Sequence, residues 1–161
     1  MEKIEIVYNK LEEAIAVMKE VAKWGREQGY RVWPDEWLTP DELITEEAKP
    51  QNFCIGKVDG NTAFALILQR SDSAYWKDSS EVQAVYIHKL CVKREYAHRN
   101  MTRLVVEVIK EECRKNGIKY IRLDTASEKV VRKIYLNAGF KIVDIIDYDN
   151  GRSMALYEME V

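Results

Sequence analysis

The sequence predicts an α+β fold in which a mixed, mostly antiparallel sheet of six to seven strands is combined with about four helices. Short runs of alternating or continuous apolar residues indicate the strands, and apolar residues three to four positions apart indicate amphipathic helices. A strand–helix–strand succession between residues 81 and 123 adds a right-handed parallel crossover. With 161 residues, 47% of them hydrophobic, the chain fits a single domain over residues 1–161.

The N-terminal part begins with a short strand and two helices. Residues 3–8 alternate charged and apolar side chains, which indicates an edge strand. Residues 10–28 repeat apolar side chains at helical spacing, and Gly29 ends this helix. Thr39 is a typical N-cap, since a proline and two acidic residues follow it, and the second helix ends before Pro50.

The middle of the chain predicts a hairpin and a longer strand. Residues 53–58 and 62–69 flank the turn sequence Asp59–Gly60, which favours a tight hairpin. A polar loop follows over residues 70–80. Residues 81–92 are rich in valine, isoleucine and tyrosine and predict the next strand.

The C-terminal part alternates helices with strands. The predicted elements are a helix over 101–115, a strand over 119–123, a helix over 127–138, and strands over 140–146 and 154–159. The turn sequence Asp149–Asn150–Gly151 joins the last two strands into a hairpin.

Composition narrows the function classes. The net charge of −2 does not favour bulk nucleic-acid binding. Three widely spaced cysteines without CxxC spacing indicate free thiols in a reducing cytoplasm, with no disulfide framework and no zinc site. The N-terminus shows no signal peptide, and no apolar run is long enough to cross a membrane. We therefore expect a cytoplasmic protein, monomeric or homodimeric, without nucleic-acid or membrane partners.

Charge is distributed unevenly along the chain. Residues 1–80 contain 10 basic and 15 acidic side chains, a net of −5, and residues 81–161 contain 15 basic and 12 acidic, a net of +3. The second part therefore favours an anionic ligand and the first part a cationic one.

The most informative segment is the predicted strand-to-helix connection after Val92. Its loop carries Arg94, Arg99 and Arg103, and the helix begins near Met101. A helix N-terminus presents unpaired N–H groups and the positive end of the helix dipole, so it can hold a phosphate. Residues 97–102 contain no proline, which leaves all six N–H groups as potential donors.

The run from Tyr86 to Phe140 resembles the acetyl-CoA signature of the GNAT N-acetyltransferase superfamily. In that family a strand leads through an R/Q-x-x-G-x-G/A loop into a helix, and a later helix closes with the phrase Y-x-x-x-G-F. Here the closing phrase is Tyr135–Phe140, and the loop is Ala97–Thr102. His98 and Asn100 stand where the family has glycines, with Asn100 tolerant of positive φ and Thr102 suited to an N-cap.

The resemblance implies a set of cofactor contacts and an acid. The implied fold is the GNAT fold, in which the two central parallel strands splay apart between Lys89–Val92 and Leu123–Thr125. Tyr135 corresponds to the tyrosine that protonates the departing CoA thiolate, which is also a packing position on its helix. The residues implied to contact acetyl-CoA are Leu90, Cys91, Val92, Ala97, His98, Arg99, Asn100, Met101, Thr102, Arg103 and Tyr135.

Two residues are candidates for the general base. His88 lies on the predicted central strand and has an ordinary pKa of about 6.5, although a structural histidine is an equally good interpretation. Glu81 lies near the start of the same predicted strand, where a solvated charge is the simpler interpretation. A cysteine acyl-enzyme through Cys91 is disfavoured, because no histidine adjoins it in sequence.

Tryptophans in the N-terminal part indicate an acceptor pocket. Trp33, Trp37 and Trp76 are the candidates, since aromatic faces attract cationic amines, whereas Trp24 fits ordinary helix packing. Acidic residues gather nearby at Asp35, Glu36, Asp41, Glu42, Glu46 and Glu47.

Together these features predict an acetyl-CoA-dependent N-acetyltransferase. The acetyl group would pass to a primary amine of a small, cationic acceptor, with acetyl-CoA as co-substrate and no metal. The alternative is a non-catalytic or weakly active GNAT-like module that binds acyl-CoA.

Overall fold

The computed structural model describes residues 3–161, and its internal contacts divide the chain into two compact units. The first unit comprises the chain up to Gln69 together with residues 89–101, and the second comprises residues 70–88 and 102–161. Strand β4 (Ala84–Val92) contributes residues to both units. The expectation of one domain over 1–161 stays a prediction.

The elements follow in the order that the sequence predicts. They are β1 (Ile4–Val7), α1 (Leu11–Glu27), α2 (Pro40–Leu43), β2 (Phe53–Val58), β3 (Asn61–Gln69), β4 (Ala84–Val92), α3 (Met101–Lys115), β5 (Tyr120–Ala126), α4 (Lys129–Asn137), β6 (Lys141–Asp147) and β7 (Ser153–Glu160). Single 3₁₀ turns occupy Asp35–Trp37, Pro50–Asn52 and Arg94–Tyr96. The sheet order β1-β2-β3-β4-β5-β7-β6, with β4 and β5 parallel, confirms the predicted α+β class and its mixed sheet.

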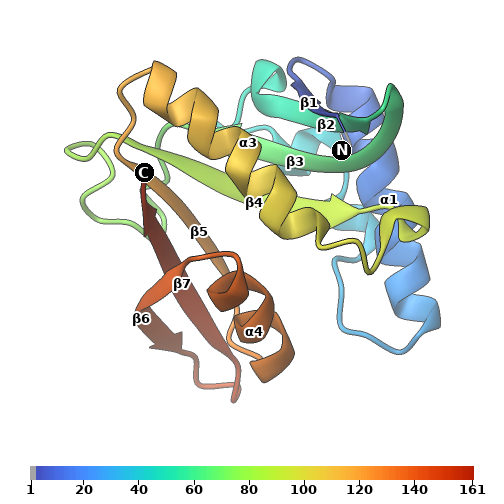
Figure 1. Ribbon diagram of the computed structural model, residues 1–161. Helices are drawn as coiled ribbons and strands as arrows, with labels where there is room; N and C mark the ends of the chain where they lie inside the picture. The colour runs from blue at the N-terminus through green and yellow to red at the C-terminus, as the bar shows by residue number, and fades with distance from the viewer. Residues whose placement is uncertain (1–2) are drawn as a thin grey trace. The chain divides into compact units, whose positions relative to one another are not determined.

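The first unit is a helix on a meander of antiparallel strands. Helix α1 contacts β2 and β3 (Figure 1), and its apolar face provides core residues such as Met18. Asp59 and Gly60 both have positive φ, 49° and 85°, which is the geometry of a type I′ hairpin turn. The predicted Asp-Gly turn is therefore confirmed, and it sets the register of β2 against β3.

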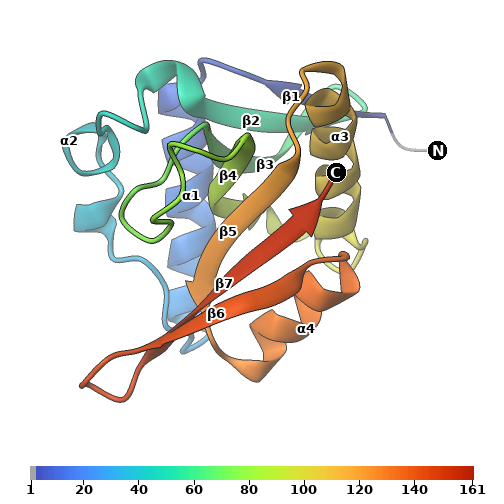
Figure 2. The same cartoon turned by 90° about the vertical axis from the view of Figure 1, so that its left-hand side faces the viewer.

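The second unit is built on β5. This strand pairs in parallel with the first part of β4 and antiparallel with β7, and β7 pairs with β6. Helix α4 lies alongside this group of strands (Figure 2). A small apolar cluster on one face includes Trp76, Ala84, Tyr86 and Leu156.

Some element boundaries differ from the prediction. Strand β4 begins at Ala84 and not at residue 81, because Glu81 and Val82 both donate backbone hydrogen bonds to the Asp78 carbonyl and remain in a turn. Helix α2 is a single turn, although its N-cap is confirmed, since the Thr39 hydroxyl accepts from the Glu42 N–H at 3.3 Å.

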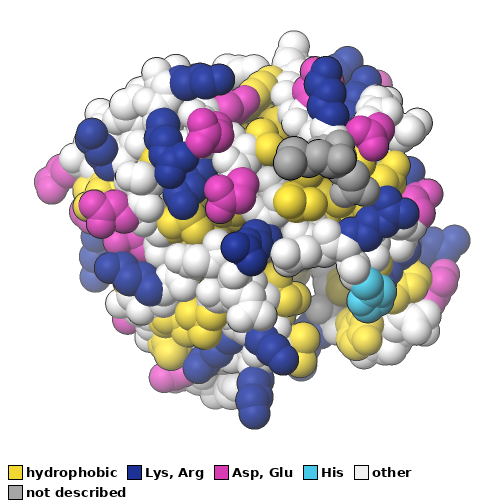
Figure 3. Space-filling model, viewed as in Figure 1, with side chains coloured by type: hydrophobic (Ala, Val, Ile, Leu, Met, Phe, Trp, Pro, Cys, Tyr) yellow, Lys and Arg dark blue, Asp and Glu magenta, His cyan; other side chains and the backbone are white. Residues whose placement is uncertain are grey.

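The surface shown in Figure 3 intersperses basic and acidic side chains, in keeping with a net charge of −2. Among the described helices, none is both long and apolar enough to cross a membrane.

Candidate functional site

The loop between β4 and α3 has an unusual backbone. His98 and Asn100 both adopt positive φ, 61° and 56°, immediately before α3 begins at Met101. These are the positions at which the sequence motif would place glycines. Positive φ is uncommon for a residue with a side chain, and it costs about 1–2 kcal/mol per residue. His98 is exposed, so its imidazole does not fill the loop.

Two details of this loop correct the sequence prediction. The Ala97 N–H donates to the Arg94 carbonyl at 3.1 Å, so it belongs to the preceding 3₁₀ turn and is not available to a ligand. Thr102 is the second residue of α3, so it is not the N-cap. The donors that remain for an anion are those around His98–Met101, since the first N–H groups of a helix have no partner within it.

Two arginines of the first unit stack on aromatic rings. The Arg94 guanidinium lies 3.7 Å from the ring centroid of Trp24, and that of Arg99 lies 5.2 Å from the centroid of Tyr96. Both contacts are in the range of cation–π attraction. The loop keeps its positive charges, and the aromatic contacts fix the positions of the two guanidinium groups.

Strand β4 has an irregular backbone at Lys89. Its parallel ladder with β5 runs from Ala84↔Tyr120 to Ile87↔Leu123, although both strands continue beyond that point. Lys89 then has a φ of 54°, which breaks the alternation of the strand. The predicted splay of the two strands stays a prediction.

Cys91 is buried in the core of the first unit. Burial raises the pKa of its thiol to about 12, well above the ordinary value. The thiolate is therefore scarce at neutral pH, and because the thiolate is the nucleophile in cysteine catalysis, this position suits a structural role.

The second unit brings two carboxylates to His88. Nε2 of His88 lies 3.1 Å from Oδ2 of Asp72, and Nδ1 lies 3.9 Å from Oδ1 of Asp124. The side chains of Asp72 and Asp124 are only 6% and 9% exposed, and that of His88 is 20% exposed. The facing atoms of His88 and Asp72 are buried and close, but they are not aligned as a hydrogen bond.

Sheet register and a loop assemble this cluster. Tyr86 pairs with Arg122 in the parallel ladder. Two residues further along, His88 and Asp124 project on the same face, because side chains alternate along a strand. Asp72 comes from the loop between β3 and β4, where its backbone N–H donates to the Ser79 hydroxyl at 3.0 Å. The sequence analysis identified His88 but missed both aspartates.

Arg122 anchors that loop. Its guanidinium donates to both carboxylate oxygens of Asp78 at 2.9 and 3.1 Å, and to Glu158 at 2.8 Å. It also donates to the Tyr86 hydroxyl at 3.0 Å. Burial by itself lowers the pKa of Arg122, but these hydrogen bonds outweigh it, so the pKa lies above its ordinary range. The hydrogen bond from Arg122 in turn lowers the pKa of Asp78.

Trp76 belongs to this anchor. It is 5% exposed, and the Arg122 guanidinium lies 4.4 Å from its ring centroid. The predicted acceptor-pocket role for Trp76 therefore gives way to a packing role, because a cation of the chain itself already faces its ring.

Two tyrosines complete the surroundings of the aspartates. Burial raises the pKa of Tyr75 to about 12, and a hydrogen bond with Tyr148 and the charges of Asp124 and Asp72 contribute to the rise. The Tyr75 hydroxyl therefore stays protonated and lies close enough to sense both carboxylates. The sequence analysis offered no signal for either tyrosine.

Tyr135 lies on α4, partly buried between two aromatic neighbours. Its ring centroid is 5.4 Å from that of Tyr157 and 6.0 Å from that of Phe140. The Phe140 N–H donates to the Tyr135 carbonyl at 3.1 Å, and Gly139 between them has a φ of 106°. This closure explains the glycine of the YLNAGF phrase, because that φ disfavours a side chain.

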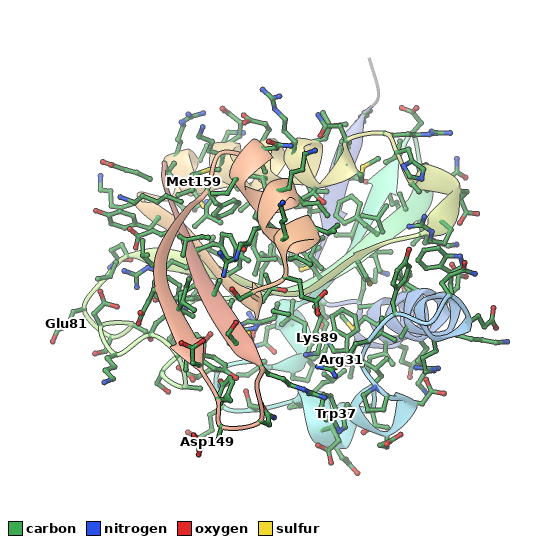
Figure 4. All side chains as sticks on the ribbon, turned by 90° about the horizontal axis from the view of Figure 1, so that it is seen from below. Arg31, Trp37, Glu81, Lys89, Asp149 and Met159 are labelled. Atoms are coloured by element: carbon green, nitrogen blue, oxygen red, sulfur yellow. The ribbon has the colours of Figure 1, made fainter. Side chains whose placement is uncertain are left out.

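The other two tryptophans lie in the first unit. Trp33 is partly buried, and the Lys89 ammonium lies 5.0 Å from its ring centroid. Trp37 is 52% exposed (Figure 4). Their predicted role in an acceptor pocket stays a prediction, although Trp33 already faces one cation.

Glu81 does not qualify as a base on the central strand. It is exposed in the turn before β4 (Figure 4), and it has no place in the cluster around His88.

A groove of about 460 Å³ also lies in the second unit, where Arg103, Lys110 and Glu107 of α3 face Met159 and Glu160 of β7. Its mixed charge indicates no single ligand.

The sequence over residues 21–161 matches the family described as Acetyltransferase (GNAT) domain. The chain belongs to the GNAT acetyltransferase family. The predicted superfamily is thereby confirmed. No curated protein matches the sequence.

Solved structures of GNAT proteins share the fold. A GNAT acetyltransferase from Listeria monocytogenes aligns with a TM-score of 0.75 at 20% identity, covering 99% of this chain and 95% of its own. The PaiA N-acetyltransferase from Thermoplasma acidophilum, solved in complex with coenzyme A, aligns with a TM-score of 0.67 at 20% identity, with 99% of both chains covered. The ribosomal-protein-S18-alanine N-acetyltransferase from Escherichia coli gives 0.66 at 14% identity, covering 100% of this chain and 94% of its own.

Membership of the GNAT family gives the loop and the cluster a context. Acetyl-CoA is the co-substrate typical of the family. His88, Asp72 and Asp124 are also the group of side chains among residues 3–161 whose ligand atoms, all within 4.8 Å of one another, have the spacing of a metal site.

Proposed function

We propose that this GNAT protein is an N-acetyltransferase that binds acetyl-CoA and transfers its acetyl group to a primary amine of a small, cationic acceptor. The observation that supports this most directly is the positive φ of both His98 and Asn100 at the start of α3. These two residues thus have the positive φ that glycine adopts readily, at the positions where the family motif has glycines.

Two of the described residues that combine a side chain with positive φ, His98 and Asn100, lie in this loop. Residues in left-handed conformation that alternate with right-handed ones turn successive N–H groups toward one concave side, which suits an anion. The adjoining helix N-terminus adds its own donors and dipole. Backbone strain of this kind clusters at functional sites, because it persists only where the structure imposes it.

We assign the remaining cofactor contacts to β4 and α3. Leu90 or Cys91 supplies a backbone N–H group to the thioester carbonyl, beyond the positive φ of Lys89. Val92 pairs with the pantetheine arm, and Arg99 and Arg103 add positive charge for the phosphates. An N–H group aimed at the developing oxyanion stabilises the transition state more than the ground state.

His88 is the proposed general base and Tyr135 the proposed general acid. His88 lies on β4 with a carboxylate oxygen 3.1 Å from one ring nitrogen and another 3.9 Å from the other. Tyr135 donates a proton to the sulfur as CoA leaves, in the role that the family motif implies. Cys91 is not a nucleophile in this scheme, because its thiol stays protonated.

Matched substitutions at Asn100 test the binding of acetyl-CoA. Asn100→Gly keeps the positive φ without strain, whereas Asn100→Val introduces a β-branched residue that resists it. A ligand that binds only the folded state raises its melting temperature. We expect acetyl-CoA to raise the melting temperature of the wild type and of Asn100→Gly, and to have a much weaker effect on Asn100→Val. Equal shifts in both variants would show that this backbone is not the binding element.

Turnover is tested by thiol release from acetyl-CoA with a panel of small amines, diamines, amino acids and lysine peptides. We expect release with at least one amine, and a loss of about 10²-fold or more in kcat for Tyr135→Phe. Binding without release across the panel would favour the alternative, a non-catalytic acyl-CoA-binding module. The three buried free cysteines fit a reducing compartment, and we propose the cytoplasm.

A further inference from the structure

The short turn that precedes the loop before α3 is tied to helix α1. This turn, Arg94–Tyr96, follows β4 closely. The Arg94 guanidinium lies 3.7 Å from the ring centroid of Trp24, in the C-terminal half of α1. One turn earlier on the same helix, a carboxylate oxygen of Glu20 lies 3.9 Å from the Lys93 ammonium. Since residues four apart share a helix face, one face of α1 contacts two consecutive residues of the chain before the loop.

The contact between Arg94 and Trp24 is a close stack. Among the cation–π contacts described within residues 3–161 its distance is the shortest, and a planar guanidinium stacks well on an aromatic face. The Trp24 ring is partly buried and also packs against Tyr30, with the ring centroids 5.8 Å apart. Although Arg94 is exposed, its guanidinium therefore has a fixed place on α1.

The backbone of Arg94 extends this tie to the start of the loop. The Ala97 N–H donates to the Arg94 carbonyl at 3.1 Å, and the Tyr96 N–H donates to the Lys93 carbonyl at 2.9 Å. Ala97 is the residue directly before His98, the first residue with positive φ. Arg94 therefore contacts α1 through its side chain and holds the beginning of the loop through its carbonyl.

The loop that follows requires such support. His98 and Asn100 have φ values of 61° and 56°, a conformation that residues with side chains rarely adopt. It persists where the surrounding structure imposes it. Glycine adopts the same conformation readily, and the family motif has glycine at both positions. Without these glycines, contacts outside the two residues have to hold the loop in its conformation.

We propose that the stack of Arg94 on Trp24 anchors the loop in its positive-φ conformation before acetyl-CoA binds. Arg94 is thus a positioning residue for acetyl-CoA and not a ligand of its phosphates. A ligand that requires one conformation binds with an apparent affinity reduced by the fraction of molecules in that conformation. Loosening the anchor therefore weakens binding without removing a contact to the ligand. This inference rests on the proposed function, in which acetyl-CoA binds at this loop.

A double-mutant cycle between Arg94 and Asn100 tests this anchor, with the Kd for acetyl-CoA measured by isothermal titration calorimetry. Arg94→Met removes the cation but keeps a side chain of similar length. We expect it to raise the Kd about 3–10-fold, as the loss of a cation–π contact predicts. In the Asn100→Gly background, where positive φ carries little penalty, the same change should raise the Kd less than about twofold. Equal rises in both backgrounds would show that Arg94 contacts the ligand directly and would overturn the proposal.

Matched variants separate the stack from charge and from helix packing. Arg31→Met removes an exposed arginine of the first unit outside the loop (Figure 4), and it should change the Kd less than about twofold, because salt screens exposed charges. Trp24→Phe keeps an aromatic face for Arg94, whereas Trp24→Leu does not. We expect Trp24→Phe to bind like the wild type and Trp24→Leu like Arg94→Met. An equal loss in both Trp24 variants would assign the effect to the packing of α1 and refute the anchor.

Amide hydrogen exchange tests the anchor without any ligand. The N–H groups of Tyr96 and Ala97 should exchange about 3–10-fold faster in Arg94→Met than in the wild type, whereas amides of β2 should keep their rates. Unchanged exchange at both residues would refute the anchor even if acetyl-CoA binds. A wild type that does not bind acetyl-CoA would refute the proposed function, whereas faster exchange in Arg94→Met would still support the anchor.

Discussion

Replacing Arg122 by methionine removes the buried guanidinium that ties the β3–β4 loop to β5 and β7. The side chain of Arg122 is 5% exposed and donates to Asp78, Glu158 and Tyr86. Methionine has a similar length without charge, so the change isolates the polar contacts more than the packing.

The partners differ in how far water can replace Arg122. The carboxylate of Asp78 is 48% exposed and can be solvated, so its pair contributes only about 0–1 kcal/mol. Glu158 is 14% exposed and would be left as a largely buried charge. Breaking a buried pair from one side costs about 3–5 kcal/mol. For a chain of this size that loss corresponds to a fall of about 6–20 °C in melting temperature.

Urea unfolding followed by circular dichroism measures the loss, with Asp78→Asn as the matched control for the exposed partner. The double variant Arg122→Met/Glu158→Met should recover part of the stability, because replacing a whole buried pair with apolar residues is often neutral. Hydrogen exchange should also rise within residues 70–83 in Arg122→Met. A loss below about 1 kcal/mol, or a double variant no more stable than Arg122→Met, would refute the reasoning.

Three further outcomes follow from single contacts. Gly56→Ala should destabilise the first unit by about 1–3 kcal/mol or more in urea unfolding, since a Cβ at Gly56 would lie 1.8 Å from the Phe64 ring, and Gly56→Ala/Phe64→Leu should recover part of it. Native Cys91 should resist Ellman's reagent at pH 8 until urea unfolds the chain, because burial raises its pKa to about 12, and fast labelling would contradict this. Because Arg122 lowers the pKa of folded Asp78, the stability contributed by this ion pair is complete above the unfolded pKa of about 3.9 and is lost as pH falls through the folded value. Asp78→Asn should therefore lose stability less steeply below pH ~4 than the wild type, and parallel acid-unfolding curves of the two proteins would argue against this.

Much of the fold is encoded locally and could be predicted. The hairpin turn at Asp59–Gly60 needs positive φ at both residues, and its two residue types favour that conformation whatever the rest of the chain does. The apolar spacing of residues 101–115 defines a helix with the same bounds as α3. In such cases neighbouring residues decide the conformation, so pattern alone is sufficient.

The predicted strand over 81–92 was wrong at its start, because no local feature marks where the strand begins. Val82 has the same β-favouring character as the residues of β4, although it lies outside the strand. Hydrogen bonds to the Asp78 carbonyl keep Glu81 and Val82 in a turn. Because β4 begins at Ala84, Glu81 lies outside the central strand on which it was a candidate base.

The amino-acid pattern alone specifies the family, the order of elements and the position of the loop before α3, because each depends on residues close together in the chain. What His98 and Asn100 do in that loop becomes visible only in three dimensions, since positive φ is uncommon for a residue with a side chain. The proximity of Asp72 and Asp124 to His88 is likewise visible only in three dimensions. Parallel register brings Asp124 to His88, but Asp72 is held through Arg122 and its contacts 36 to 44 residues apart in sequence. Long-range ion pairs and register leave no local pattern, so the chemistry of this cluster emerges only on folding.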